Sequence, residues 1–142
     1  MRASLDREAG EAQRTASPSL RLDVWLLLSG RLLRAVLFLG GAAQKAFDPG
    51  EVIGLLVGWH LPSLLVWPAL AYNAAAGLAL VFGVAVRPVA LSLGLYCGLT
   101  SAFHFLPDDP WQMTIFVKNW AIAGGCLALA VAGAGRIAVR LD

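Results

Sequence analysis

Basic and amide side chains stand inside long apolar stretches of this sequence, where polar groups are costly to place. Arg31 and Arg34 lie three residues apart in the stretch RLLRAVLFLGGAAQKAF, which also contains Lys45. A charged side chain at the centre of a bilayer costs about 2.5–3.5 kcal/mol on insertion scales, so it needs a partner or a ligand. Asp23 lies before this stretch, which itself holds no carboxylate, and the other apolar stretches hold none. The unbalanced positive charge favours an anionic or hydrogen-bond-accepting ligand, such as a quinone carbonyl, a sulfur oxyanion or a lipid phosphate.

Helical spacing places these polar groups, together with small residues, on one stripe of each apolar stretch. If the four stripes face inward, they form the buried polar seams of a four-helix bundle, which is the predicted arrangement. The stripes are Arg31, Arg34, Phe38, Gly41 and Lys45; Asn73, Gly77, Leu80 and Val84; Ala90, Gly94, Cys97, Ser101 and His104; and Lys118, Ile122, Gly125 and Leu129.

The candidate ligand-binding residues each have a structural alternative. Arg34 is either a ligand group or a bridge to backbone carbonyls and Asn73. Lys118 is alternatively an interfacial anchor, and His104 an outer-face hydrogen-bonding residue. Arg31 is predicted to snorkel toward the cytoplasm. No catalytic residue is assigned, and the candidate set is Arg34, Lys45, Asn73, His104, Lys118 and Asn119.

The sequence offers no metal motif. A single histidine in the bundle is too few for a bis-histidine haem, and no His, Cys or carboxylate cluster predicts a zinc site. Cys97 and Cys126 lie in apolar runs without a CxxC pair, so they are predicted to be packing residues, with a redox pair as the alternative. The glycine pairs at 40–41 and 124–125 predict close helix contacts. No P-loop, GxGxxG, GxSxG or HExxH pattern is present.

The composition is that of a membrane protein. The 142 residues are 58% hydrophobic and 14% charged, and the mean hydropathy is +0.71. In soluble domains about a quarter of the residues are charged. The net charge of +2 gives no case for nucleic acid as a partner, so the expected partner is the lipid bilayer.

Four apolar stretches are long enough to cross a bilayer, which takes about 20 helical residues. They predict an all-α, integral membrane four-helix bundle, because lipid offers no partner for backbone polar groups. A short interfacial segment, DPGEVIGLLVGWHLP, is expected between the first two helices. A signal peptide is the alternative for the first stretch, and its arginines argue against that. The expected ranges are a mobile polar tail at 1–20, a membrane domain at 21–136 with helices at about 22–46, 64–86, 88–106 and 111–135, and a short cytoplasmic tail at 137–142.

Arginines outside the four stretches predict the orientation. Cytoplasmic loops carry an excess of Lys and Arg, and an even number of spans places all of these arginines on one side. The chain is therefore expected to be a multi-pass protein of the inner or plasma membrane with both termini in the cytoplasm. The arginines concerned are Arg2, Arg7, Arg14, Arg21, Arg87, Arg136 and Arg140.

Several segments together resemble the DoxX/DoxD-like family of small four-helix membrane proteins. The resemblance covers roughly residues 25–132 and rests on the order and spacing of its motifs. These are RLLRAVLFLGGAAQKAFDP (31–49), NAAAGLALVFGVAVRPVAL (73–91), FHF (103–105) and FVKNWAIAGGCLALA (116–130). The family often has a glutamate where this chain has Asn73, which keeps hydrogen bonding but cannot exchange protons.

The resemblance implies a membrane location and a redox setting. The family includes a membrane subunit of thiosulfate:quinone oxidoreductase, so it implies an oxidoreductase subunit with quinone as candidate cofactor and a redox protein or a second copy as candidate partner. In this hypothesis Arg34 and Lys118 donate to the ligand, Asn73 orients it, and Arg34→Leu abolishes binding. The alternatives are a non-catalytic anchoring subunit that docks partner proteins and, less favoured because no internal repeat is evident, a small transporter.

Overall fold

The chain folds into four long helices and one short helix, as shown by a computed structural model that describes residues 17–139. No strand occurs within these residues, so the predicted all-α bundle is confirmed. Two turns of 3-10 helix, η1 and η2, precede α4 and follow α5. The elements are α2 (Ser17–Phe47), α3 (Gly50–Gly58), η1 (Ser63–Leu65), α4 (Val66–Phe82), α5 (Val86–Ser101), η2 (Ala102–His104) and α6 (Pro110–Ala132).

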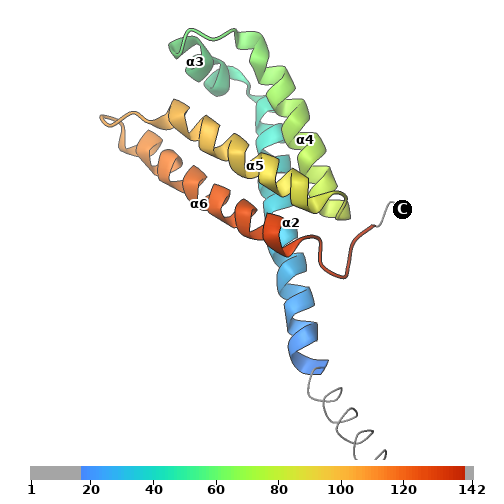
Figure 1. Cartoon of the computed structure of the whole chain (residues 1–142). Helices are drawn as coiled ribbons and strands as arrows, with labels where there is room; N and C mark the ends of the chain where they lie inside the picture. Colours follow the sequence, from blue (N-terminus) through green and yellow to red (C-terminus); the bar gives the residue numbers. More distant parts are fainter. Residues whose placement is uncertain (1–16, 140–142) are drawn as a thin grey trace, which may run out of the picture.

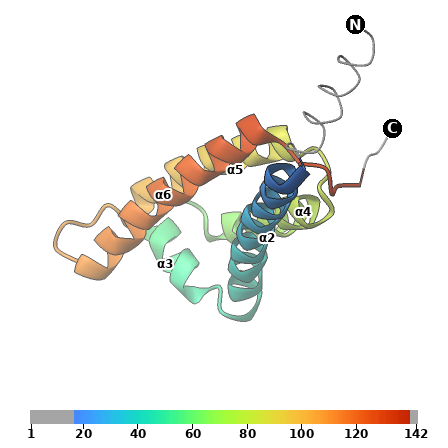
Figure 2. The same cartoon turned by 90° about the horizontal axis from the view of Figure 1, so that it is seen from below.

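The helices are arranged as two antiparallel pairs. α2 packs mainly against α4, and α5 packs mainly against α6 (Figure 1). The pairs meet at the end where α4 turns into α5 and spread apart toward the other end, where α3 lies between them (Figure 2). We call these the closed end and the α3 end. The core between the helices is built largely from small side chains such as Ala35, Ala76, Ala90 and Cys126, which lets the helices approach closely.

Local sequence signals explain where the long helices begin and end. Asp109 caps α6, since its Oδ1 accepts from the backbone N–H of Trp111 at 2.9 Å and of Gln112 at 3.2 Å. Pro110 occupies the first helical position, where its missing N–H costs nothing. Gly83 ends α4 with a φ of 77°, a left-handed conformation that glycine adopts without strain.

The predicted seams agree with the burial in α4 and α5. Asn73, Gly77 and Leu80 are buried on α4, and Ala90, Gly94, Cys97 and Ser101 are buried on α5. On α6 the buried face is Ala123, Cys126 and Leu129, whereas Lys118 is exposed. The prediction for α6 was therefore wrong at its start, because the first turns of α6 lie at the α3 end, where the pairs have separated.

Within the described residues, three helical segments are long and apolar enough to cross a membrane: Ser63–Phe82, Val86–His104 and Pro110–Ala132. α2 is not one of these three segments. Its 31 residues span about 46 Å, more than the ~30 Å of a hydrocarbon core. Since α2 lies along α4, the fourth span predicted at 22–46 stays a prediction that this packing supports.

The chain ends differ from the expected ranges. α2 begins at Ser17, inside the segment expected to be a mobile tail, and residues 1–16 and 140–142 lie outside the described part. α6 ends at Ala132 rather than near 135, because Gly133 has a φ of 82° outside the helical region. The following segment returns to α4, where the N–H of Val139 donates to the carbonyl of Phe82 at 2.8 Å.

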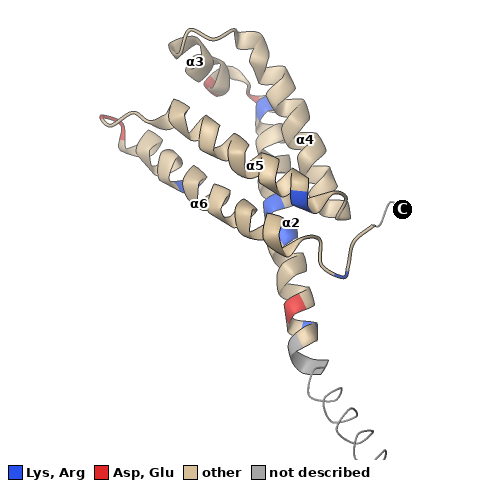
Figure 3. Cartoon of the chain, viewed as in Figure 1, with Lys and Arg blue, Asp and Glu red and all other residues tan. Residues whose placement is uncertain are grey.

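The described arginines and most of the described acidic side chains lie toward opposite ends of the molecule, whereas Lys45 and Lys118 lie toward the α3 end (Figure 3). Arg87, in the first turn of α5, and Arg136, just after α6, lie near the closed end, and the described part of the chain starts and ends on that side of the molecule (Figure 1). Of the described acidic residues, all except Asp23 lie at the α3 end, in the α2–α3 connection, in α3 itself and in the α5–α6 loop.

Candidate functional site

A cavity of about 870 Å³ lies between the two helix pairs. α2, α3, α4, α5 and α6 all contribute to its wall, which is mostly apolar. The separation of the pairs at the α3 end creates this space, because neither pair fills it with side chains. Five of the six candidate residues line it: Lys45, Asn73, His104, Lys118 and Asn119.

Asn73 and Lys45 face the same point on the cavity wall. Asn73 is only 3% exposed, and its Oδ1 has no hydrogen-bond partner among residues 17–139. Lys45 Nζ donates to the carbonyl of Gly41, one helical turn earlier, at 3.2 Å. A side-chain carbon added to Gly41 would lie 3.5 Å from Asn73 Nδ2 and 3.7 Å from Lys45 Nζ. The two nitrogens therefore border a notch that exists because residue 41 has no side chain.

His104 is held from the neighbouring helix. Its Nδ1 lies 2.6 Å from Gln112 Oε1 on α6. An amide oxygen only accepts, so with this amide orientation Nδ1 carries the proton and a neutral ring presents Nε2 as an acceptor. Lys118 and Asn119 follow on α6 and line the same cavity, although Lys118 remains exposed. This wall thus carries both donors and an acceptor.

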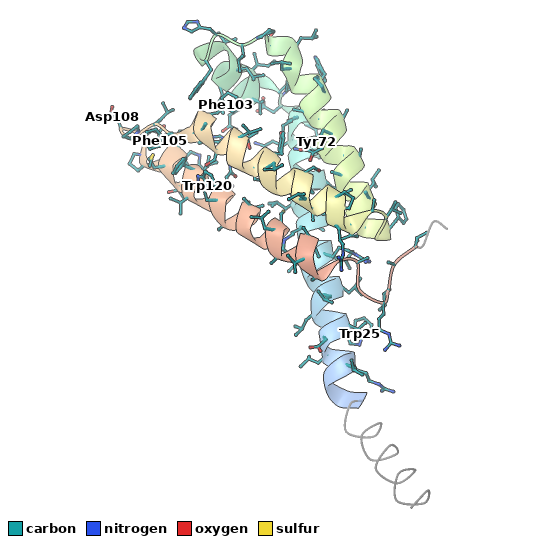
Figure 4. All side chains as sticks on the ribbon, viewed as in Figure 1. Trp25, Tyr72, Phe103, Phe105, Asp108 and Trp120 are labelled. Carbon is teal, nitrogen blue, oxygen red and sulfur yellow. The ribbon has the colours of Figure 1, made fainter. Side chains whose placement is uncertain are left out.

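Sequence reasoning missed several polar residues of the cavity. Glu51, from α3, lines it and accepts from Gln44 Nε2 at 3.3 Å. The expectation of wholly unbalanced positive charge is corrected, since a carboxylate reaches the same cavity from outside the long helices. Tyr96 also lines it and lies 5.1 Å, ring to ring, from Tyr72, which is held between α4 and α5 (Figure 4). The turn DPG before Glu51 was the one signal that α3 folds back toward α2.

Arg34 lies apart from the cavity and is not brought together with the other candidates. Its Nη1 donates to the carbonyl of Gly30 in its own helix at 2.8 Å, and its guanidinium lies against Gly125 of α6. Gly124, the neighbouring glycine, has open space at its side-chain position. Arg34 thus contacts backbone, as its structural alternative predicted, but it makes no hydrogen bond to Asn73.

Arg31, expected to snorkel, is instead buried at 2% exposed, more deeply than the other cations in the described part of the chain. Its Nη1 donates to the carbonyl of Ala134 at 2.7 Å, and its Nη2 to that of Val81 at 3.5 Å. These carbonyls lie at and just beyond the C-terminal ends of α4 and α6, where helices leave carbonyls unpaired and the dipole favours a cation. Gly83 leaves the space, since a side-chain carbon there would lie 2.7 Å from Arg31 Nη1.

The two cysteines are free and buried. Cys97 lines the cavity, whereas Cys126 is fully buried in the core and does not. Within residues 17–139 no group of three or more His, Cys, Asp or Glu side chains is placed to hold a metal ion.

Comparison with known proteins decides the family. Residues 26–105 match the DoxX family, which is more than half of the chain. The chain belongs to the DoxX family. The inner membrane protein YqjF of Escherichia coli (strain K12) is 27% identical over 118 residues, which cover 82% of this chain and 90% of that relative. No solved structure gives a significant match. This DoxX protein is thus an integral membrane protein, and its matched region includes the cavity walls from α2 to α5.

Proposed function

We propose that this DoxX protein binds a quinone, or another polar or anionic ligand, in the cavity between its helix pairs, as a small subunit of a membrane redox system. The observation that carries the proposal is the cavity itself, with about 870 Å³ of mostly apolar space and five polar candidates on its wall. Ligand sites of this kind measure about 300–1,000 Å³ and combine an apolar lining with few polar groups. A quinone likewise combines an apolar ring and chain with polar carbonyl groups.

The lining determines which groups of a ligand are recognised. Lys45 and Lys118 carry positive charge, and Asn73 and Asn119 offer amide N–H groups, so carbonyl or anionic oxygens find donors. His104, oriented by Gln112, offers an acceptor for a hydroxyl. In this proposal the chain binds and orients the ligand, and a partner redox protein exchanges electrons with it.

The segregation of charge supports a proposed orientation. The arginine-bearing closed end faces the cytoplasm, and the cavity lies toward the opposite side of the membrane (Figure 3). Both chain termini are then cytoplasmic. A protease applied to sealed inside-out vesicles should remove a C-terminal epitope tag, and protection of the tag contradicts this orientation.

Ligand retention after purification tests the function directly. The protein is purified from its native membrane in mild detergent, extracted with organic solvent and analysed by mass spectrometry. Ile122→Trp fills the cavity, whereas Val131→Trp adds the same ring to α6 at an 80% exposed position outside it. We expect near-stoichiometric quinone in the wild type and in Val131→Trp, and its loss in Ile122→Trp. Arg34→Leu should retain the quinone, because Arg34 does not line the cavity.

The proposal fails if the wild type releases no quinone, or if Ile122→Trp retains as much as Val131→Trp. A different ligand that is retained by the wild type and lost from Ile122→Trp keeps the cavity as the site and replaces quinone as its occupant.

An anchoring subunit is the second candidate, favoured by the part of α2 that extends beyond α4, α5 and α6 (Figure 4). This extension exposes Leu22, Trp25 and Leu26, and Trp25 is 61% exposed. If it docks a partner protein, Trp25→Ser should release a protein that co-purifies with the wild type, while quinone content is unchanged. Equal recovery of every co-purifying protein with wild type and variant removes this candidate.

A further inference from the structure

At the notch at Gly41, donors from two helices converge on a space in the cavity wall that an added side-chain carbon would fill. Lys45 comes from the same helix as Gly41, and Asn73 comes from α4. A carbon in the notch would be 3.5 Å from Asn73 Nδ2 and 3.7 Å from Lys45 Nζ. Both distances are ordinary contacts for carbon, and a small inward shift brings an oxygen to hydrogen-bonding distance of both nitrogens.

Both groups have hydrogen-bonding capacity that the protein does not use. The Lys45 ammonium has three N–H donors, and its contact with the Gly41 carbonyl takes one. Asn73 is buried at 3% exposed, and its Oδ1 lacks a partner among the described residues. A buried amide oxygen without a partner is costly. A ligand carbonyl pairs with the Nδ2 donors of this amide, and only a ligand group that donates, such as a hydroxyl, pairs with Oδ1.

The surroundings define the rest of the ligand. Apolar side chains of Phe38, Leu55, Leu56 and Ile122 line the same cavity beyond the notch. An apolar ring or chain of a ligand gains contacts with these side chains and leaves water when it binds. The site therefore has a polar end at Gly41 and an apolar body.

We propose that the notch at Gly41 binds a carbonyl oxygen of the ligand, which accepts hydrogen bonds from Lys45 Nζ and Asn73 Nδ2 while the ring lies against the apolar wall. This assignment rests on the proposed function and extends it, because it fixes which end of a quinone enters and which residues select for the oxygen. A hydrogen bond from a charged donor discriminates strongly against a ligand without the acceptor.

The test uses a matched pair of ligands and a matched pair of variants. The ligands are a short-chain, fully substituted benzoquinone, which does not add to thiols, and a fully alkylated benzene of similar size. Gly41→Ala fills the notch with one methyl group, and Gly40→Ala adds the same methyl to the neighbouring cavity residue, where nothing lies within 4 Å. Affinities follow from the dependence of the unfolding midpoint on ligand concentration in detergent.

We expect the wild type and Gly40→Ala to bind the benzoquinone at least about tenfold more tightly than the alkylbenzene. In Gly41→Ala and in Lys45→Met this preference should fall to about threefold or less, with the alkylbenzene affinity retained. Because Gly41→Ala meets only ordinary contacts, its stability without ligand should match that of Gly40→Ala.

A preference unchanged in Gly41→Ala and Lys45→Met overturns the notch assignment and leaves the cavity as the quinone site. Equal affinity of the wild type for both ligands has the same meaning. If the wild type binds neither ligand, the proposed function fails together with the assignment.

Discussion

At the closed end, Arg31 is 2% exposed and donates to the carbonyls of Val81 and Ala134. At the α3 end, Asn73 is 3% exposed, and its Oδ1 has no partner within the described part of the chain. The two side chains are almost equally buried, and one polar atom of each, Arg31 Nε and Asn73 Oδ1, lacks a partner among the described residues. They differ in that the Arg31 guanidinium also donates to backbone carbonyls of two segments, whereas Asn73 lines the cavity. Burial alone therefore does not distinguish a polar group that ties helices together from one that a ligand could reach.

Removing the Arg31 guanidinium should have the largest effect on stability. Arg31→Met keeps much of the side-chain volume but leaves buried carbonyls without their donor, so we expect the free energy of unfolding to fall by about 2–4 kcal/mol. Denaturant titration in detergent micelles measures it. Arg136→Met, at an exposed position, is the control and should change it by less than about 0.5 kcal/mol. An Arg31→Met protein as stable as this control contradicts the structural role.

Gly77→Ala tests the tight pair to which Arg31 belongs. The added carbon would lie 2.8 Å from Leu39 Cγ and 3.3 Å from the carbonyl oxygen of Ala35, so α2 must move away from α4. We expect a loss of about 1–3 kcal/mol in the same titration. Gly98→Ala meets only the Trp120 ring at 3.7 Å and should be neutral or stabilising by a few tenths of a kcal/mol, because alanine favours a helix over glycine. Equal stability of the two variants would show that the α2–α4 contact is looser than described.

Asn73→Leu should separate stability from ligand binding at the α3 end. It removes a buried amide with an unpartnered oxygen, so the free energy of unfolding should stay the same or rise by up to about 1 kcal/mol. Ligand retention should fall in the same protein, as expected when a site trades stability for function. A loss of more than about 1 kcal/mol would place Asn73 with Arg31 as a structural group.

Alanine substitutions at the two glycines of the pair on α6 should differ least in their effect on the free energy of unfolding. Gly125→Ala collides with the guanidinium of Arg34, a flexible group that can move, whereas Gly124→Ala meets nothing within 4 Å. Alanine favours a helix over glycine by up to about 1 kcal/mol. We expect Gly124→Ala to gain a few tenths of a kcal/mol and Gly125→Ala to lose a similar amount. The reverse order would mean that Arg34 does not rest on Gly125.

The helices and the polar candidates could be predicted from sequence because both are local properties. Apolar stretches of about 20 residues specify membrane helices, and rare polar residues within them stand out. The two arginines could not be assigned in this way. The carbonyls that pair with Arg31 come from residues 50 and 103 positions later, so only the packed structure distinguishes Arg31 from Arg34.

The glycines show the same limit. The sequence pattern at 40–41 predicts a close helix contact, yet Gly40 faces open space and Gly41 borders side-chain nitrogens across the cavity wall. Glycine allows close approach of any group, whether a helix, a side chain or a ligand. Glu51 was missed for a related reason, because nothing in a nine-residue helix specifies that it folds back between the helix pairs.

The carbonyl of Ala134 has a consequence for how the protein is made. In a chain synthesised from its N-terminus, Arg31 emerges from the ribosome long before residue 134. Until α6 has inserted, the guanidinium lacks its shortest hydrogen bond and must stay hydrated, paired with lipid headgroups or held by the insertion machinery. When α6 has inserted, the carbonyl of Ala134 accepts a hydrogen bond from Arg31, which connects the two helix pairs. A chain truncated before Ala134 lacks this acceptor and keeps a less satisfied charge in α2.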